Sequence, residues 1–246
     1  MRSAPVLSIV IPAFNEARSL PVCLPTVVSS LEMWSKSRGG ETGEIVVVDN
    51  ESEDGTAEVA KSLGARVVRE SIRNIGQVRN AGAGAAYGRY LFFVDADVIL
   101  PVEAVTTAMR LLVSGRHVGG AIPPHYAPRR LSARLLCWYW DAHRRRHRNA
   151  QGVNQFCTVD AFRELAGYRT DWFMGEDMEF FQRLRTLGDR LHRPVVLVEE
   201  LRVRPSCRRY DTWPGWRMLW WQNPVTARLR PKSAAFWRHW YQSTVR

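Results

Sequence analysis

An alternation of strand-like and helix-like segments over the first hundred residues constrains the fold of this chain more than any other feature. Apolar runs rich in β-branched residues occupy residues 6–13, 44–50, 65–70 and 89–100. Segments with helical spacing of apolar or small residues separate them, at 16–36, 54–64 and 77–88. This order predicts an α/β domain with a mostly parallel sheet, and the near-continuous apolar character of the runs indicates helices on both faces.

The remaining residues are less regular but continue without a linker. Helices are predicted over 102–114 and 175–188, and a strand leading into a short helix is predicted over 153–168. No internal repeat or low-complexity segment divides the 246 residues. We therefore predict a single domain over 1–246, with halves at about 1–100 and about 101–200 and a basic, aromatic tail over about 201–246.

Arginine dominates the charge of the chain. The formal net charge is +11, and lysine occurs only as Lys36, Lys61 and Lys232. Because arginine binds phosphate in a bidentate manner and stacks on flat groups, this charge favours a partner that carries phosphate, such as a nucleotide or an anionic lipid. A compositional bias of the source genome explains the same charge equally well.

The cysteines and the hydropathy indicate a reducing, aqueous compartment. Cys23, Cys137, Cys157 and Cys207 form no closely spaced pair, so we expect reduced thiols. The first apolar run is interrupted at Pro12, and no uninterrupted apolar span approaches 18 residues. We therefore expect a cytoplasmic protein that contacts a membrane only at its surface.

Polar clusters follow three of the predicted strands at the point where each strand ends. They are residues 12–16, residues 49–55, and the pair Asp95 and Asp97. Because ligands of open α/β sheets bind beyond the carboxyl ends of the strands, one crevice should contain all three clusters. Two carboxylates this close suit Mg²⁺, which takes one or two of them and completes its shell with water and diphosphate oxygens. Alternatively, both acids only cap a turn and a helix.

Three other candidate residues also have purely structural explanations. Asp49 ends a strand and suits a nucleobase or a ribose, but acidic turns after strands are common. Arg79 suits a phosphate, but its small-residue segment equally suits a helix packed tightly on the sheet. Asp177 lies in the first turn of a predicted helix, where a negative charge is favourable in any protein.

Four motifs in order along the chain are more specific than any one of them. They are SIVIPAFNEARSL at 8–20, IVVVDNESEDGTAEVA at 45–60, RNIGQVRNAGAGAAYGRYLFFVDAD at 73–97, and FCTVDAFRELAGYRTDWFMGEDMEFFQRLRTLG at 156–188. Together they resemble the family 2 glycosyltransferases over about residues 6–190. The resemblance implies a GT-A fold, with a Rossmann-like nucleotide-sugar half at about 1–100 and a smaller acceptor-side subdomain at about 101–200.

The resemblance also implies a role for each matching residue. A nucleotide sugar would bind to Pro12, Ala13, Asn15, Glu16, Asp49, Asn50, Arg79, Asp95, Ala96 and Asp97. Asp49 would hold the base, while Asp95 and Asp97 would bracket the ribose and the metal diphosphate. Asp97 would be the main ligand of Mg²⁺ or Mn²⁺, with Asp95 beside it. Asp177 would be the general base for inverting transfer to an acceptor hydroxyl, supported by Glu176.

Departures from the family pattern restrict the expected reaction. Asn50 stands where many members carry a second Asp, and the Gln/Arg-x-x-Arg-Trp signature of processive synthases is absent. We therefore expect a transferase that adds one sugar. As donor, we expect a UDP-sugar in preference to a GDP-sugar. A lipid-linked acceptor would place the protein at the inner face of the cell membrane.

Basic and aromatic residues mark two further segments. In 129–148, Leu131, Leu135, Trp138 and Ala142 share one helical face surrounded by arginine, as in interfacial helices that bind anionic membranes. Alternatively, the tryptophan side chains of both segments pack inside the acceptor half, and the arginines are solvated or hold the diphosphate. In the tail, Arg208 and Arg209 are candidates for binding the leaving diphosphate.

Two other classes of protein account for parts of this pattern. A basic, aromatic chain suits a nucleic-acid or membrane binding module without catalysis, but no nucleic-acid motif occurs, and we expect no nucleic-acid partner. A nucleotidyltransferase on a similar fold would require a glycine-rich phosphate loop near the first strand, where this chain has PAFNEA. A family member that has lost catalysis would not need Asp49, Asp95, Asp97 and Asp177 together.

Overall fold

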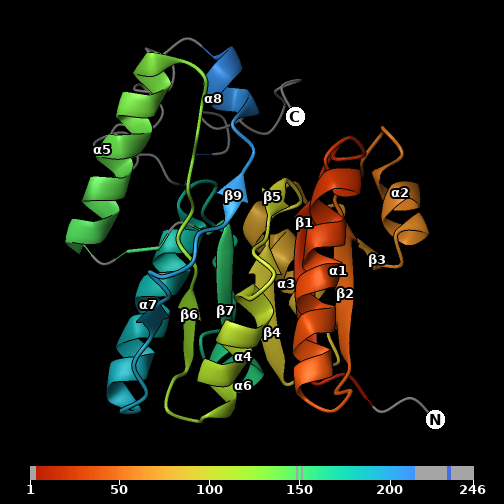
Figure 1. Ribbon diagram of the computed structural model, residues 1–246, viewed down its shortest axis with the longest axis vertical. Coiled ribbons are helices and arrows are strands. Elements are labelled where there is room, and N and C mark those ends of the chain that lie inside the picture. Colours follow the sequence, from red (N-terminus) through yellow and green to blue (C-terminus); the bar gives the residue numbers. More distant parts are fainter. Residues whose placement is uncertain (1–3, 148, 151, 214–231, 234–246) are drawn as a thin grey trace.

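A seven-stranded sheet forms the centre of the protein (Figure 1). The computed structural model describes residues 4–147, 149–150, 152–213 and 232–233. In spatial order the strands are β3 (Arg66–Arg69), β2 (Gly43–Asp49), β1 (Leu7–Ala13), β4 (Tyr90–Val94), β7 (Asn154–Thr158), β6 (Gly119–Ala121) and β8 (Val196–Leu197). A separate pair joins β5 (Val98–Ile99) to β9 (Arg204–Pro205) in antiparallel orientation.

Helices cover both faces of this sheet. The helices of the described residues are α1 (Leu20–Ser37), α2 (Thr56–Ser62), α3 (Ile75–Ala85), α4 (Ala104–Val113), α5 (Leu131–His147), α6 (Val159–Glu164), α7 (Glu176–Arg190) and α8 (Arg208–Thr212). Of these, α5 and α8 lie above the sheet in Figure 1 and not on its faces. None of the helices in the described residues is long and apolar enough to cross a membrane. Most of the predicted tail, 214–231 and 234–246, lies outside the described residues.

The strand directions confirm the predicted mostly parallel sheet. β1 pairs in parallel with both β2 and β4, and β2 pairs in parallel with β3. β7 then pairs antiparallel with β4 and with β6. Because β1, β2 and β4 run in the same direction, the polar residues that follow them reach the same edge of the sheet.

Alternating residues of the strands build a core on each face. Leu7, Ile9 and Ile11 of β1 point to the side covered by α1 and α4. On this side, α1 contributes Leu20 and Leu24 to the core. Val10 points to the opposite side, covered by α3, α6 and α7. Both sides of the central strands are thus buried, which explains their near-continuous apolar sequence.

The small residues of α3 allow a close approach to the sheet. A Cβ added at Gly82 would lie 2.4 Å from Cγ1 of Val10 and 2.7 Å from Cγ2 of Val48. At Gly84 the same addition would meet nothing within 4 Å. Tight packing therefore accounts for Gly82, as one of the two sequence interpretations of this helix predicts.

Candidate active site

A cavity of about 670 Å³ opens beyond the carboxyl ends of β1 and β4. Its wall also includes the first turn of α7, part of α5 and the segment from β9 to α8. Twelve of the residues selected from the sequence line it: Pro12, Ala13, Glu16, Asn50, Arg79, Asp95, Ala96, Asp97, Glu176, Asp177, Arg208 and Arg209. The fold therefore brings the strand-end clusters to one crevice, together with two segments more than 70 residues further along the chain.

The residues of the first two clusters differ in how they meet this cavity. Asn15, with φ 54°, accepts a hydrogen bond on Oδ1 from the backbone N–H of Glu53 at 2.9 Å. Asp49 is buried and accepts one from Ser52 N–H at 3.3 Å. Asn15, in the turn after β1, and Asp49, the last residue of β2, lie beside the cavity and do not belong to its lining. Asn50 lines it and donates to two backbone carbonyls after β3, at 2.6 and 3.1 Å.

Arg79 is the buried centre of the cavity floor. Only 2% of this residue is exposed, and its guanidinium lies 2.9 Å from Asp95 Oδ1 and 2.7 Å from Glu176 Oε1. It also donates to the backbone carbonyl of Gly152 at 3.2 Å. Where the sequence suggested a phosphate partner, the structure thus gives Arg79 two carboxylates, because α3 packs it beneath the cavity and not at its mouth.

The charges around Arg79 perturb one another. Although burial alone would lower it, Asp95 and Glu176 raise the pKa of Arg79 above its ordinary value. Burial, reinforced by the adjacent charge of Asp177, raises the pKa of Glu176 to about 7 in spite of Arg79. Desolvation also raises the pKa of Asp95, against the opposing effect of Arg79. Arg79 therefore opposes the desolvation that raises the pKa values of these two acids, and their charges in turn stabilise its own.

Asp177 is oriented by backbone donors at the start of α7. Its Oδ2 accepts a hydrogen bond from Gly152 N–H, and its Oδ1 accepts one from Met178 N–H at 2.7 Å. Gln155 of β7 donates to the Asp177 carbonyl at 2.9 Å, which ties this turn to the sheet. Each carboxylate oxygen offers about two lone-pair directions, so Asp177 retains acceptor capacity toward the cavity that it lines.

Arg208 joins the segment after β9 to the acids that follow β1 and β4. Its Nη2 lies 2.8 Å from both carboxylate oxygens of Glu16 and 3.5 Å from Asp97 Oδ2, and its Nη1 donates to Ser19 at 3.0 Å. Desolvation, reinforced by Glu16 and Asp95, raises the pKa of Asp97 to about 7. Arg209 lines the same wall, where burial lowers its pKa.

The acids of this wall fit a divalent cation that binds together with a diphosphate. The described residues contain no group of three or more His, Cys, Asp or Glu side chains that could hold a metal by itself. A Mg²⁺ or Mn²⁺ ion that binds with diphosphate needs only one or two carboxylates. Asp95 is engaged by Arg79, whereas Asp97 faces the crowded charge of Glu16, which a cation would relieve. Asp97 is therefore the better of the two expected ligands.

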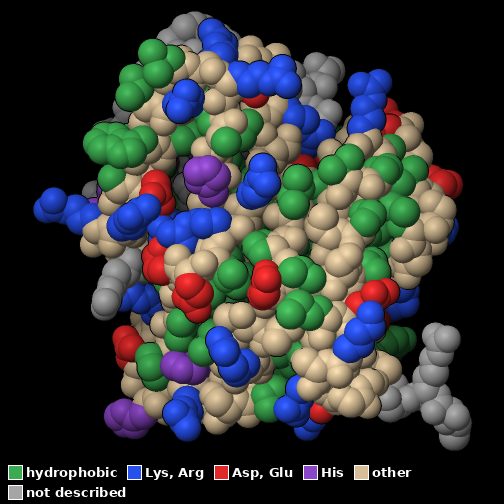
Figure 2. Space-filling model, in the orientation of Figure 1, with side chains coloured by type: hydrophobic (Ala, Val, Ile, Leu, Met, Phe, Trp, Pro, Cys, Tyr) green, Lys and Arg blue, Asp and Glu red, His purple; other side chains and the backbone are tan. Residues whose placement is uncertain are grey.

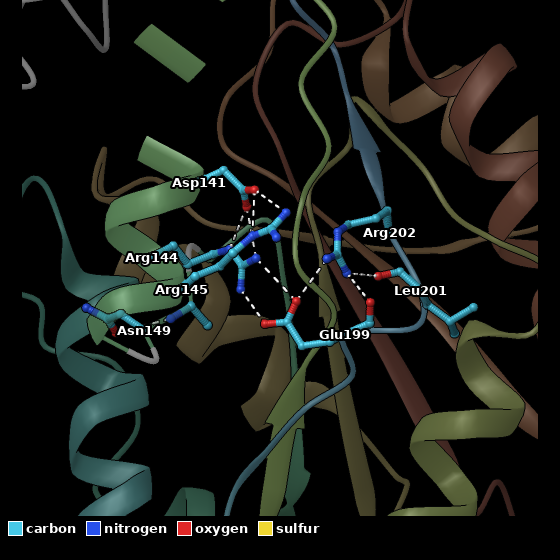
Figure 3. A network of polar contacts seen from close by, with 8 residues as sticks. Asp141, Arg144, Arg145, Asn149, Glu199, Leu201 and Arg202 are labelled. Atoms are coloured by element: carbon cyan, nitrogen blue, oxygen red, sulfur yellow. Dashed lines mark hydrogen bonds and ion pairs between the residues drawn. The ribbon is translucent and has the colours of Figure 1, made fainter. Parts of the chain in front are cut away.

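The sequence predicted a helix within 129–148 but not the residues by which it forms part of the cavity wall. Trp140, His143 and Arg144 of α5 line the cavity. Arg144 is 4% exposed and donates to Asp141 at 2.9 Å and to Glu199 at 2.7 Å (Figure 3). In the sequence, Arg144 is one member of a run of three arginines, and only the contact with Glu199, 55 positions later, distinguishes it.

Solved structures with this architecture define the class of the fold. A mannosyltransferase from Pyrobaculum calidifontis in complex with GDP-Man and Mn²⁺ aligns with a TM-score of 0.66 and 18% identity, over 88% of this chain and 61% of that chain. Glucosyl-3-phosphoglycerate synthase from Mycobacterium tuberculosis, in complex with Mn²⁺, UDP and phosphoglyceric acid, aligns with a TM-score of 0.58 and 21% identity, over 87% and 73%. The fold is the GT-A fold of glycosyltransferases.

Sequence comparison gives the family. Residues 8–174 match glycosyl transferase family 2, so the chain belongs to this family. The dolichyl-phosphate beta-glucosyltransferase of Mus musculus is 36% identical over 98 residues, which are 40% of this chain and 30% of that protein. The alignment thus spans less than a third of that relative, and the family match ends two residues before Glu176.

Proposed function

We propose that this chain is an inverting glycosyltransferase that moves one sugar from a nucleotide diphosphate sugar to an acceptor hydroxyl. The observation that carries the proposal is that Asp97, which follows β4, and Asp177, in the first turn of α7, line the same cavity. Sugar transfer requires a stabilised leaving group and a deprotonated nucleophile, and these two acids suit the two tasks. Membership of family 2 favours this activity over nucleotidyl transfer and over a binding module without catalysis.

The donor would bind where β1 and β4 end. Asp97, with Asp95 beside it, would hold Mg²⁺ or Mn²⁺ against the diphosphate, and Arg208 and Arg209 would bind the diphosphate oxygens. The bound cation supplies neutralisation of the charge on the departing diphosphate. Arg208 would then exchange its contact with Glu16 for the phosphates, to which a guanidinium is equally suited.

The acceptor would bind on the α7 side of the cavity. Asp177 would take the proton of the acceptor hydroxyl. The oxygen of this hydroxyl would attack the anomeric carbon from the face opposite the diphosphate, and the bond to the diphosphate would break. Such a general base contributes about 10²–10⁴-fold to the rate. Glu176, fixed by Arg79, would keep the first turn of α7 in place, so that Asp177 points at the acceptor.

A UDP-sugar as donor and a lipid-linked acceptor are also part of the proposal. UDP and GDP-Man occur in the two structural relatives described above, and dolichyl phosphate is part of the name of the mouse relative. A lipid-linked acceptor would place the protein in the cytoplasm, peripheral to the inner face of the cell membrane. The net charge of +11 is consistent with an anionic bilayer at that location.

The test combines nucleotide binding with transfer. A cognate nucleotide diphosphate at 100 times its dissociation constant stabilises the protein by about 2.7 kcal/mol, so melting curves with Mn²⁺ should select between UDP and GDP. Asp177→Asn should keep this stabilisation and lose transfer of radiolabelled sugar to a lipid extract by about 10²–10⁴-fold. Asp97→Asn should lose the stabilisation that depends on Mn²⁺.

The matched control is Asp189→Asn, which changes an exposed acid at the far end of α7 and should affect neither readout. Absence of stabilisation by any nucleotide diphosphate, or full activity of Asp177→Asn, would contradict the proposal.

A further inference from the structure

The outward face of α5 is apolar, the reverse of an ordinary surface helix. Leu131, Leu135 and Trp138 are 70%, 61% and 72% exposed, and Ala142 is exposed beside them. These positions recur at helical spacing and therefore form one stripe along the helix. Figure 2 shows hydrophobic side chains gathered over α5, at the upper left of that view.

The opposite face of α5 belongs to the cavity. Trp140 and Arg144 line it, and Arg144 anchors the helix to Glu199 through hydrogen bonds at 2.7 and 3.3 Å (Figure 3). Glu199 also accepts a hydrogen bond from Arg202 at 2.9 Å, which joins α5 to the segment before β9. The exposed stripe is thus attached to the acceptor side of the cavity by a network of ion pairs.

The flanks of the stripe are cationic. Arg134, Arg145 and Arg146 are exposed and lie on either side of it in the helical projection, and Arg130 precedes the helix. Exposed leucine and tryptophan between arginines match the boundary between headgroups and acyl chains, where anionic lipids attract the guanidinium groups. A protein partner would require an acidic surface around an apolar groove, whereas an anionic bilayer supplies both properties over any area.

We propose that α5 is the membrane-docking surface of the protein, with Leu131, Leu135 and Trp138 inserted into the headgroup region of an anionic bilayer. Because the other face of α5 lines the cavity, this orientation brings the acceptor side of the site to the bilayer surface. The proposal that α5 binds the bilayer is argued from the exposure and charge of its residues and does not depend on the proposed catalytic activity. Only the purpose of docking, access to a lipid-linked acceptor, rests on the proposed function.

Co-sedimentation with vesicles tests the docking surface without any turnover. The full chain should bind vesicles of phosphatidylglycerol and phosphatidylcholine, and should bind pure phosphatidylcholine much more weakly. Leu135→Ser/Trp138→Ser should weaken partitioning by at least about tenfold, because both inserted side chains are lost. The control Val22→Ser/Met33→Ser removes two exposed apolar residues from α1 and should bind as the wild type does.

A second pair of variants isolates the charge. Arg134→Gln/Arg146→Gln should weaken binding several-fold at low salt, and Arg110→Gln/Arg116→Gln, with the same net charge, should do so clearly less. Equal vesicle binding by the α5 variants and their controls would overturn the proposal. The proposal would also be overturned if light scattering shows a dimer that only Leu135→Ser/Trp138→Ser converts to a monomer, because a second copy of the chain would then cover the stripe. Melting curves with nucleotide report separately on the catalytic proposal.

Discussion

Replacement of Arg79 by Met is the sharpest test of how the cavity floor is stabilised. The substitution keeps an unbranched chain of similar length but removes the ion pairs with Asp95 and Glu176 and the hydrogen bond to Gly152. Removal of one partner from a buried ion pair costs about 3–5 kcal/mol, because the other charge stays buried without compensation. We expect Arg79→Met to lose this amount of unfolding free energy at pH 7.5, as measured by urea denaturation.

The pH dependence of this loss carries the argument further. Without Arg79, the pKa values of Asp95 and Glu176 should rise further above their unfolded values, so the folded variant binds more protons than its unfolded state. Its stability should therefore fall as the pH rises from about 4.5 through 7, and its deficit relative to the wild type should shrink at pH 5. Arg79→Met/Glu176→Gln should recover part of the loss, since one of the two uncompensated charges is removed.

The matched control is Arg38→Met, which breaks a partly exposed pair with Glu41 at 3.4 Å and should cost no more than about 1 kcal/mol. If Arg79→Met and Arg38→Met lose equal stability, or if the deficit of Arg79→Met is the same at pH 5 and pH 7.5, the network around Arg79 does not stabilise the protein as described.

Three further predictions follow from other parts of the structure. The pKa of Asp97 is raised to about 7 by desolvation and by nearby acids, and Asp97 must lose its proton to bind a metal ion. The affinity for Mn²⁺ in the presence of UDP, measured by calorimetry, should therefore rise about fivefold to tenfold from pH 6 to pH 8. An affinity that does not change with pH would show that Asp97 is not a ligand. Arg208→Gln should tighten Mn²⁺ binding in the absence of nucleotide by about fivefold, because Glu16 loses its cation, and should weaken UDP binding. If the variant binds both Mn²⁺ and UDP more weakly, Arg208 does not exchange Glu16 for the diphosphate as proposed. Gly82→Ala should cost about 1–3 kcal/mol of unfolding free energy through overpacking, whereas Gly84→Ala should gain about 0.5–1 kcal/mol; equal effects would show that α3 can shift away from the sheet.

The sequence predicted the first half of the fold well because local signals and global topology agree there. Each apolar run of that half became a strand, and the parallel order of β1, β2 and β4 brought their terminal residues together. The antiparallel orientation of β7 and β6 could not be derived, since strands of five and three residues carry no sign of direction in their sequence. Their orientation depends on the loops that connect them.

The site was predictable where its residues follow strands and not where they depend on distant contacts. Asp95 and Asp97 are recognisable from their place after an apolar run. The pairing of Arg79 with Glu176 joins residues 97 positions apart, and no local pattern distinguishes it from a phosphate contact. Arg144 was hidden in the same way, because its neighbours in the arginine run are exposed while it is buried.

The ion pair between Arg208 and Glu16 has a consequence for the order of assembly. It joins residues 192 positions apart, so it forms only after nearly all of the described sequence has left the ribosome. Until then, Glu16 and Asp97 lie at the end of a parallel sheet without their nearest cation. During synthesis, the emerging N-terminal half therefore carries these two acids without Arg208, and the later segment from β9 to α8 supplies both the cation and part of the cavity wall.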